Sequence, residues 1–291
     1  MIQTAKAIVR PLIEGERKFA YFKGKLSLHR HLLRIANSNA PVLIGPWMGE
    51  VGFEILYWIP FLHWVFEKYP INSTRVTIIS RGGSHHWYQH LGKTRYLDLL
   101  SVMSPGEFRD FNLDRMRETG AQKQATFSSQ DSGFLKKIRD RFPEEKCEMI
   151  HPSLMFGLFK NFWAGHESVE MVRRHTRYRP LKAPILAPDF NLKLPSEFIA
   201  IKFYFSDALP KSEENTRSCQ SLIQRFARNQ NIVVFGTGMS IDDHSEPKIE
   251  HTDRIFYIDS FLRPENNLEI QTAILGRAKA FIGTTGGFSY L

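Results

Sequence analysis

The stretch Pro41-Val-Leu-Ile-Gly45, followed by Trp47-Met-Gly-Glu-Val-Gly52 and an apolar run to about Tyr69, decides the fold. A short apolar strand, a glycine-bearing turn and an apolar helix in this order make one β-α unit. A second strand, Arg75-Val-Thr-Ile-Ile-Ser80, ends in Arg81-Gly-Gly83. Because strands alternate with helices, we expect a mostly parallel sheet covered by helices.

The rest of the first half continues this alternation. Leu97, Leu99 and Leu100 are expected in helical or loop segments, before a charged helix over Asp131–Arg141 and a further strand over Glu148–His151. Residues 166–195 are rich in Arg, His and Pro, a composition typical of a connection between domains.

A second α/β series follows this connection. We expect strands at Phe198–Phe205, Ile232–Phe235, Ile255–Ile258 and Ala280–Gly283, and helices at Glu213–Asn229 and Asn267–Lys279. The chain thus divides into a basic amphipathic segment (1–38), an acceptor-side Rossmann-like domain (39–165), a linker (166–195) and a donor-side Rossmann-like domain (196–291). Since Leu291 follows a strand and the start of a helix, we expect the last domain to be truncated.

Composition indicates a soluble globular protein: 42% of its 291 residues are hydrophobic and 24% are charged. The two cysteines, Cys147 and Cys219, fit neither a disulfide framework nor a zinc motif, and they favour a reducing cytoplasm. The longest apolar stretch, Ile55–Phe66, is shorter than the roughly 20 residues of a membrane-spanning helix.

The positive charge is concentrated at the beginning of the chain. Residues 1–37 contain eight Lys or Arg and two Glu, which leaves +6 of the total +9. A basic segment with interleaved apolar residues fits an anionic membrane surface. A solvated helix packed on the protein body explains the same pattern, and we favour both over nucleic-acid binding.

The first candidate site is the turn that contains Gly49, Glu50 and Glu54. Backbone N–H groups at a strand-to-helix turn receive anions or polar groups. The two carboxylates are four residues apart, so we expect them on one face of the helix start. An ionised carboxylate there suits a general base, and Glu50 is the candidate; Glu54 fits a structural role better.

The second candidate site follows the second strand, where Arg81 can hold a phosphate or carboxylate and His85 can transfer protons. Ligands of parallel sheets bind outside the carboxyl ends of the strands, so this loop and the Glu50 turn should line one cleft. No third ligand has metal spacing, and no metal is expected.

Two groups of residues in the second half fit a donor site. Lys202 and Lys211 follow the first strand of this half, Gly236 follows its second strand and Asp259 follows its third. A lysine after the first strand is expected to neutralise a diphosphate. Asp259 is expected to reach a ribose hydroxyl. The last strand is followed by hydroxyls and glycines that let backbone amides approach a phosphate: Thr284, Thr285, Gly286 and Gly287. The G-x-G-x-x-G dinucleotide fingerprint is incomplete at Gly236.

These motifs resemble GT-B glycosyltransferases, in particular the heptosyltransferase-like group of bacterial surface polysaccharide synthesis. Gly49-Glu50 is similar to that group's acidic turn, Phe281-Ile-Gly-Thr-Thr-Gly-Gly287 to its donor-diphosphate motif, and Lys202 or Lys211 to its lysine. Thr284 stands where that group has an acid, and the aromatic Trp47–Trp64 segment differs from its first helix.

The resemblance implies two Rossmann-like domains facing a cleft, with a nucleoside-diphosphate sugar as donor and no further cofactor. The resemblance also implies a saccharide or lipid-linked acceptor and Glu50 as the general base. It implies a cytoplasmic enzyme that can bind peripherally to the inner face of the membrane. The alternatives are a nucleotide-sugar epimerase, an NAD-dependent oxidoreductase and a non-catalytic binding module.

Overall fold

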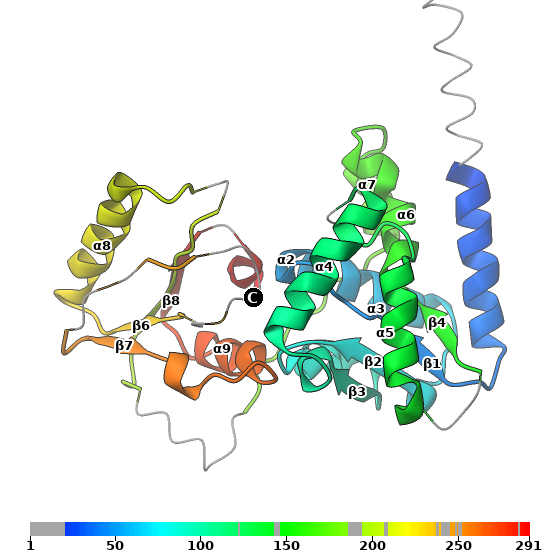
Figure 1. The fold of residues 1–291 in the computed structure, drawn as a ribbon, viewed down its shortest axis with the longest axis horizontal. Helices are drawn as coiled ribbons and strands as arrows, with labels where there is room; N and C mark the ends of the chain where they lie inside the picture. Colours follow the sequence, from blue (N-terminus) through cyan, green and yellow to red (C-terminus); the bar gives the residue numbers. More distant parts are fainter. Residues whose placement is uncertain are drawn as a thin grey trace, which may run out of the picture.

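The computed structural model describes residues 21–121, 123–142, 146–185, 194–206, 209–236, 239, 245–247, 249, 252–284 and 286–291. Figure 1 shows two lobes side by side, each built around its own sheet, with the C-terminus between them. No helix in this described part of the chain is long and apolar enough to cross a bilayer.

The first lobe contains a sheet of parallel strands in the order β3-β2-β1-β4. Its strands are β1 (Val42–Ile44), β2 (Val76–Ser80), β3 (Arg95–Asp98) and β4 (Glu148–Ile150). Its helical segments are α2 (Val51–Phe53), η1 (Glu54–Trp58), α3 (Ile59–Lys68), η2 (Ser73–Arg75), η3 (Ser84–Leu91), η4 (Leu99–Ser101), α4 (Pro105–Thr119), α5 (Ser129–Ile138), η5 (Arg139–Arg141), α6 (Pro152–Trp163) and α7 (Val169–Arg174).

The second lobe repeats this order with parallel strands arranged β7-β6-β5-β8. Its strands are β5 (Ile199–Lys202), β6 (Ile232–Val234), β7 (Ile255–Tyr257) and β8 (Ala280–Gly283), and its helical segments are α8 (Glu213–Ala227), η6 (Asp259–Phe261), α9 (Asn267–Leu275) and η7 (Gly287–Tyr290). In each sheet the second and third strands of the lobe lie on one side of its first strand, and the fourth strand lies on the other side. Each lobe therefore has a topological switch point, between β1 and β4 and between β5 and β8.

Aromatic packing forms the core under the first switch point. The Trp47 ring lies 5.8 Å from Trp58 and 6.1 Å from Phe156, and both pairs are stacked. Trp47 and Trp58 are fully buried. The apolar run after β1 is therefore a core helix, as the sequence predicts, and it fixes the turn that precedes it.

The described part of the basic segment is a helix over residues 21–36 that packs on the first lobe. Leu28, Leu32 and Ile35 are buried in the core of that lobe. Their spacing of four and three residues places them on one helix face.

The lobes touch at their switch points. A Cβ on Gly287 would collide with Val51, and the Gly52 position faces the Tyr290 ring. The Gly82 carbonyl also accepts hydrogen bonds from the N–H groups of Leu268 (2.8 Å) and Glu269 (3.1 Å) at the start of α9. The turn after β1 therefore abuts the turn after β8.

Several predicted elements differ in the structure; the helix expected to run to Lys279 ends at Leu275. Leu97 lies in β3, because the strand pairs with β2 through residues 95–98. The predicted linker contains α7, whose Met171 and Val172 are buried against the first lobe. The strand expected to run to Phe205 ends at Lys202, because Phe205 pairs with Ser245 in an antiparallel bridge.

Candidate functional site

The turn after β1 is held by the sheet and by a glutamine from a distant loop. Gly45 N–H donates to the Ile150 carbonyl at 3.0 Å, and Trp47 N–H donates to Ile79 at 2.9 Å. The buried Gln124 amide accepts from Met48 N–H and donates to the Pro46 carbonyl, both at 2.9 Å. These bonds satisfy the backbone of the turn and fix its path.

Glu50 lies at the end of this turn, at the lobe boundary. It is the N-cap residue of α2, but its side chain makes no capping hydrogen bond, and it is exposed. Val51, the next residue, touches Gly287 of the second lobe. The position thus combines an exposed carboxylate with the contact between the two switch points.

Glu54 is completely buried, in contrast to Glu50. One carboxylate oxygen accepts hydrogen bonds from Ser80 Oγ, at 2.6 Å, and from the Tyr88 hydroxyl. The other oxygen has no partner among the described residues. Burial raises the pKa of Glu54 to about 7, although the charge of Arg81 and both hydrogen bonds act in the opposite direction. Because Glu54 is completely buried, no substrate can contact its carboxyl group.

A second carboxyl, the half-buried Asp98 at the end of β3, belongs to the same polar cluster. It accepts from Gly83 N–H at 2.7 Å and from the Tyr96 hydroxyl at 3.3 Å, and Ser84 Oγ lies 3.1 Å from that hydroxyl. Burial raises the pKa of Asp98 despite these donors. Ser84 Oγ also donates to Ser80 Oγ at 3.2 Å, so two acids, two tyrosines and two serines form one polar cluster between the helical segment after β1, the loop after β2, and β3.

Arg81 and His85 take different positions on the second loop. Arg81 is 4% exposed, and its guanidinium lies 5.1 Å from the Phe108 ring centre, so it is a core cation close to Glu54. His85 Nε2 lies 3.9 Å from the Glu269 carboxylate of the second lobe. It therefore contributes to the lobe contact.

The structure also reveals a buried histidine–aspartate pair that the sequence analysis missed. His151 Nε2 lies 3.6 Å from Asp131 Oδ1, and Ser153 N–H donates to His151 Nδ1 at 3.2 Å. Burial raises the pKa of Asp131, but hydrogen bonds and charge from His151, together with the Ser128 donors, outweigh it and leave the pKa lowered. His151 follows β4, so this pair lies at the first switch point.

At the second switch point, Lys202 lies beside the turn after β8. Its ammonium donates to the Phe235 carbonyl at 3.1 Å and to Gln271 Oε1 at 2.9 Å, and its carbonyl accepts from Thr284 N–H at 3.1 Å. The Thr284 hydroxyl is buried and has no partner within the described residues. The structure thus brings Lys202 and Thr284 together, as expected.

The other predicted donor residues are spread along the same lobe. Lys211 lies on an exposed groove before α8, Asp259 is exposed at the start of η6, and the Gly236 position faces the Glu246 carboxylate. A Cβ on Gly286 would collide with the Tyr204 hydroxyl. Thr285 lies outside the described residues.

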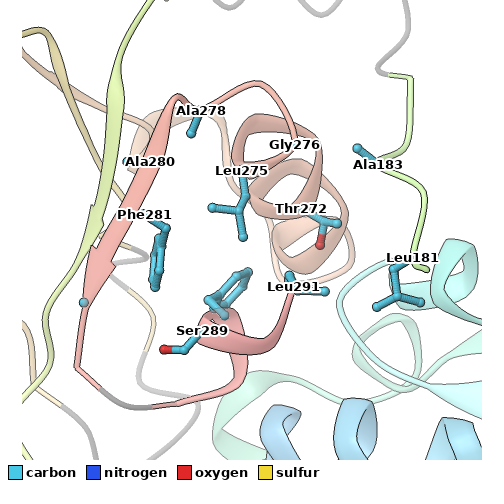
Figure 2. Close-up of a pocket in the computed structure, with 12 residues that line it drawn as sticks. Leu181, Ala183, Thr272, Leu275, Gly276, Ala278, Ala280, Phe281, Ser289 and Leu291 are labelled. Atoms are coloured by element: carbon cyan, nitrogen blue, oxygen red, sulfur yellow. The ribbon is translucent and has the colours of Figure 1, made fainter. Parts of the chain in front are cut away.

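A groove of about 610 Å³, lined by polar as well as apolar atoms, lies on the second lobe, beside the chain that connects the two lobes. Figure 2 shows Phe281 of β8, Leu275 of α9 and Leu291 pointing toward it, with Leu181 and Ala183 on the opposite side. None of the predicted site residues lines this groove, although Gly283, Phe288 and Ser289 of its lining flank the turn after β8. In the described part of the chain, no three His, Cys, Asp or Glu side chains gather as metal ligands would.

Comparison with known proteins identifies no family. No family model and no curated protein sequence matches this chain. Among solved structures, the chain is similar to the glycosyltransferase SnogD from Streptomyces nogalater, with a TM-score of 0.34 and 12% identity over 86% of this chain and 77% of that one. A likeness of this size assigns neither fold nor activity.

Proposed function

We propose that this protein is a glycosyltransferase that moves a sugar from a nucleoside diphosphate to the hydroxyl of a saccharide or lipid-linked acceptor. The observation that carries the proposal is the contact between two switch points of identical strand order, with Val51 against Gly287. Parallel α/β sheets bind ligands at such points. Two that face each other provide neighbouring places for a donor and an acceptor.

In this proposal the donor lies in the second lobe. The diphosphate binds near Lys202 and Thr284, where the amides of Gly286 and Gly287 and the lysine charge stabilise the leaving group. Lys202 then exchanges its bonds to Phe235 and Gln271 for the phosphate. Since Val51 covers Gly287, we expect the lobes to separate before the donor enters.

Glu50 is the proposed base, because its carboxylate is exposed at the lobe boundary and makes no capping bond. The acceptor hydroxyl transfers its proton to Glu50 as its oxygen bonds to the anomeric carbon. The bond from that carbon to the phosphate oxygen breaks, and the diphosphate leaves with the electron pair. Attack from the face opposite the leaving group inverts the anomeric centre.

The test combines ligand binding with a matched pair of variants. We expect one of UDP, GDP or ADP to raise the melting temperature, and Glu50→Gln to bind that nucleotide while losing transfer by about a hundredfold or more. Glu214→Gln, an exposed carboxylate in the first turn of α8, serves as the control and retains activity. Full activity of Glu50→Gln removes the base assignment. Stabilisation by NAD alone points to the oxidoreductase alternative and overturns the proposal.

A further inference from the structure

The helix over residues 21–36 buries one apolar stripe, Leu28, Leu32 and Ile35, against the first lobe, and it exposes a second one. Phe22 is 63% exposed, Leu26 38% and Leu33 39%. Their spacing of four and seven residues places them along one line on the helix surface. Single exposed apolar residues are ordinary on a soluble protein, but these three lie along one side of a single helix.

This exposed stripe is held in place by polar contacts that the helix makes with the first lobe. His29 Nδ1 lies 2.8 Å from the Tyr69 hydroxyl, and His31 Nε2 lies 2.8 Å from the Met149 carbonyl. Arg34 pairs with Glu148 at 2.8 Å. Because these contacts fix the rotation of the helix, the exposed stripe cannot turn into the core. Figure 1 shows the helix on the outer flank of the first lobe, away from the second lobe.

The charge of the helix is of one sign. Residues 21–36 contain Lys23, Lys25, Arg30 and Arg34 and no acidic residue. Lys23 and Arg30 are exposed next to the apolar stripe. An apolar stripe bordered by cations is complementary to a surface that offers hydrocarbon below a layer of negative charge.

We propose that this face docks the protein on an anionic lipid membrane. The leucines and Phe22 enter the boundary between head groups and acyl chains, while Lys23 and Arg30 pair with lipid phosphates. A nucleic acid would use the cations but leave the apolar stripe in water, so lipid fits both features better. The inference does not depend on the proposed transferase activity, because docking requires neither donor nor acceptor.

The experiment measures co-sedimentation of the full chain with vesicles of phosphatidylcholine, with and without phosphatidylglycerol. We expect binding only to the anionic vesicles, weaker at higher salt. Each basic side chain near such a surface contributes roughly fivefold to partitioning, so Lys23→Gln with Arg30→Gln should lower it about 25-fold. Leu26→Ser with Leu33→Ser should lower it about tenfold or more, because the inserted apolar area is lost.

Matched controls come from α8 of the second lobe. Leu222→Ser removes a leucine of the same 38% exposure, and Arg225→Gln removes an exposed cation; both should bind vesicles like the wild type. Melting temperatures of all variants identify any that are misfolded. Equal loss in the α8 variants, or no preference for anionic vesicles, overturns the proposal. Salt-sensitive retention on DNA without vesicle binding overturns it in favour of nucleic acid.

Discussion

Replacing Glu54 by Gln tests whether burial determines the protonation state of this carboxyl group. Burial raises its pKa from 4.5 to about 7, so between these values the folded chain holds a proton that the unfolded chain releases. The free energy of unfolding contributed by Glu54 therefore falls as pH rises through this interval. At roughly 1.4 kcal/mol per pH unit, the whole interval amounts to about 3 kcal/mol.

Gln has the shape of Glu and does not ionise. Its Oε1 accepts from Ser80 and Tyr88 as the carboxylate does, and its amide nitrogen takes the place of the oxygen without a partner. The amide nitrogen without a partner lowers the free energy of unfolding by the same amount at every pH. The difference in free energy of unfolding, Glu54→Gln minus wild type, should therefore rise by about 3 kcal/mol from about pH 4.5 to about pH 7.5.

Urea unfolding across this pH range provides the measurement. The difference curve is needed because His63 and His86, whose pKa values burial lowers to about 4, contribute an opposite slope to both proteins. Glu67→Gln, which alters an exposed carboxylate paired with Arg177, serves as the control and should give a flat difference. A flat difference for Glu54→Gln as well would refute the reasoning.

Three further predictions concern the lobe contact and the buried Asp131. Gly287→Ala should open the lobe boundary and increase the radius of gyration in solution scattering, whereas Gly133→Ala, with no neighbour within 4 Å, should not. Asp131→Asn should lower the free energy of unfolding by about 2 kcal/mol near neutral pH, because the buried carboxylate accepts hydrogen bonds from Ser128 N–H and Oγ. Because the Asp131 pKa is lowered, this difference should shrink as pH falls through the ordinary aspartate range, in urea titrations. Trp87→Phe removes the indole bond to Thr272 and part of a fully buried ring, and should cost about 2 kcal/mol in thermal unfolding.

Sequence patterns predict the strands that carry apolar runs, and they do so for a physical reason. Strands β1, β2, β5 and β6 are buried on both faces, so nearly all their residues are apolar. β3 lies at the edge of its sheet, is half exposed, and reads Arg-Tyr-Leu-Asp. An edge strand of this composition has no apolar run, which explains why Leu97 was expected outside a strand.

The polar pairs are harder to predict because they join residues far apart in the chain. Asp131 and His151 are separated by 20 positions, and neither position has a local pattern that indicates the other. Part of the signal was present: Ser128 and Asp131 form a capping box, which a serine followed three residues later by an acid indicates. That pattern fixes the helix start, but only the fold brings β4 beside it.

Glu50 and Glu54 show how a correct spacing rule leads to a wrong placement. Residues four apart share a face only when both belong to the same helix. Glu50 has extended backbone angles, φ −66° and ψ 146°, so α2 begins after it. Glu54 starts the π-helical segment η1, whose wider turn changes the angular position of the residues that follow. One carboxylate is therefore exposed at the lobe boundary and the other is buried beneath it, which separates the candidate base from a structural acid.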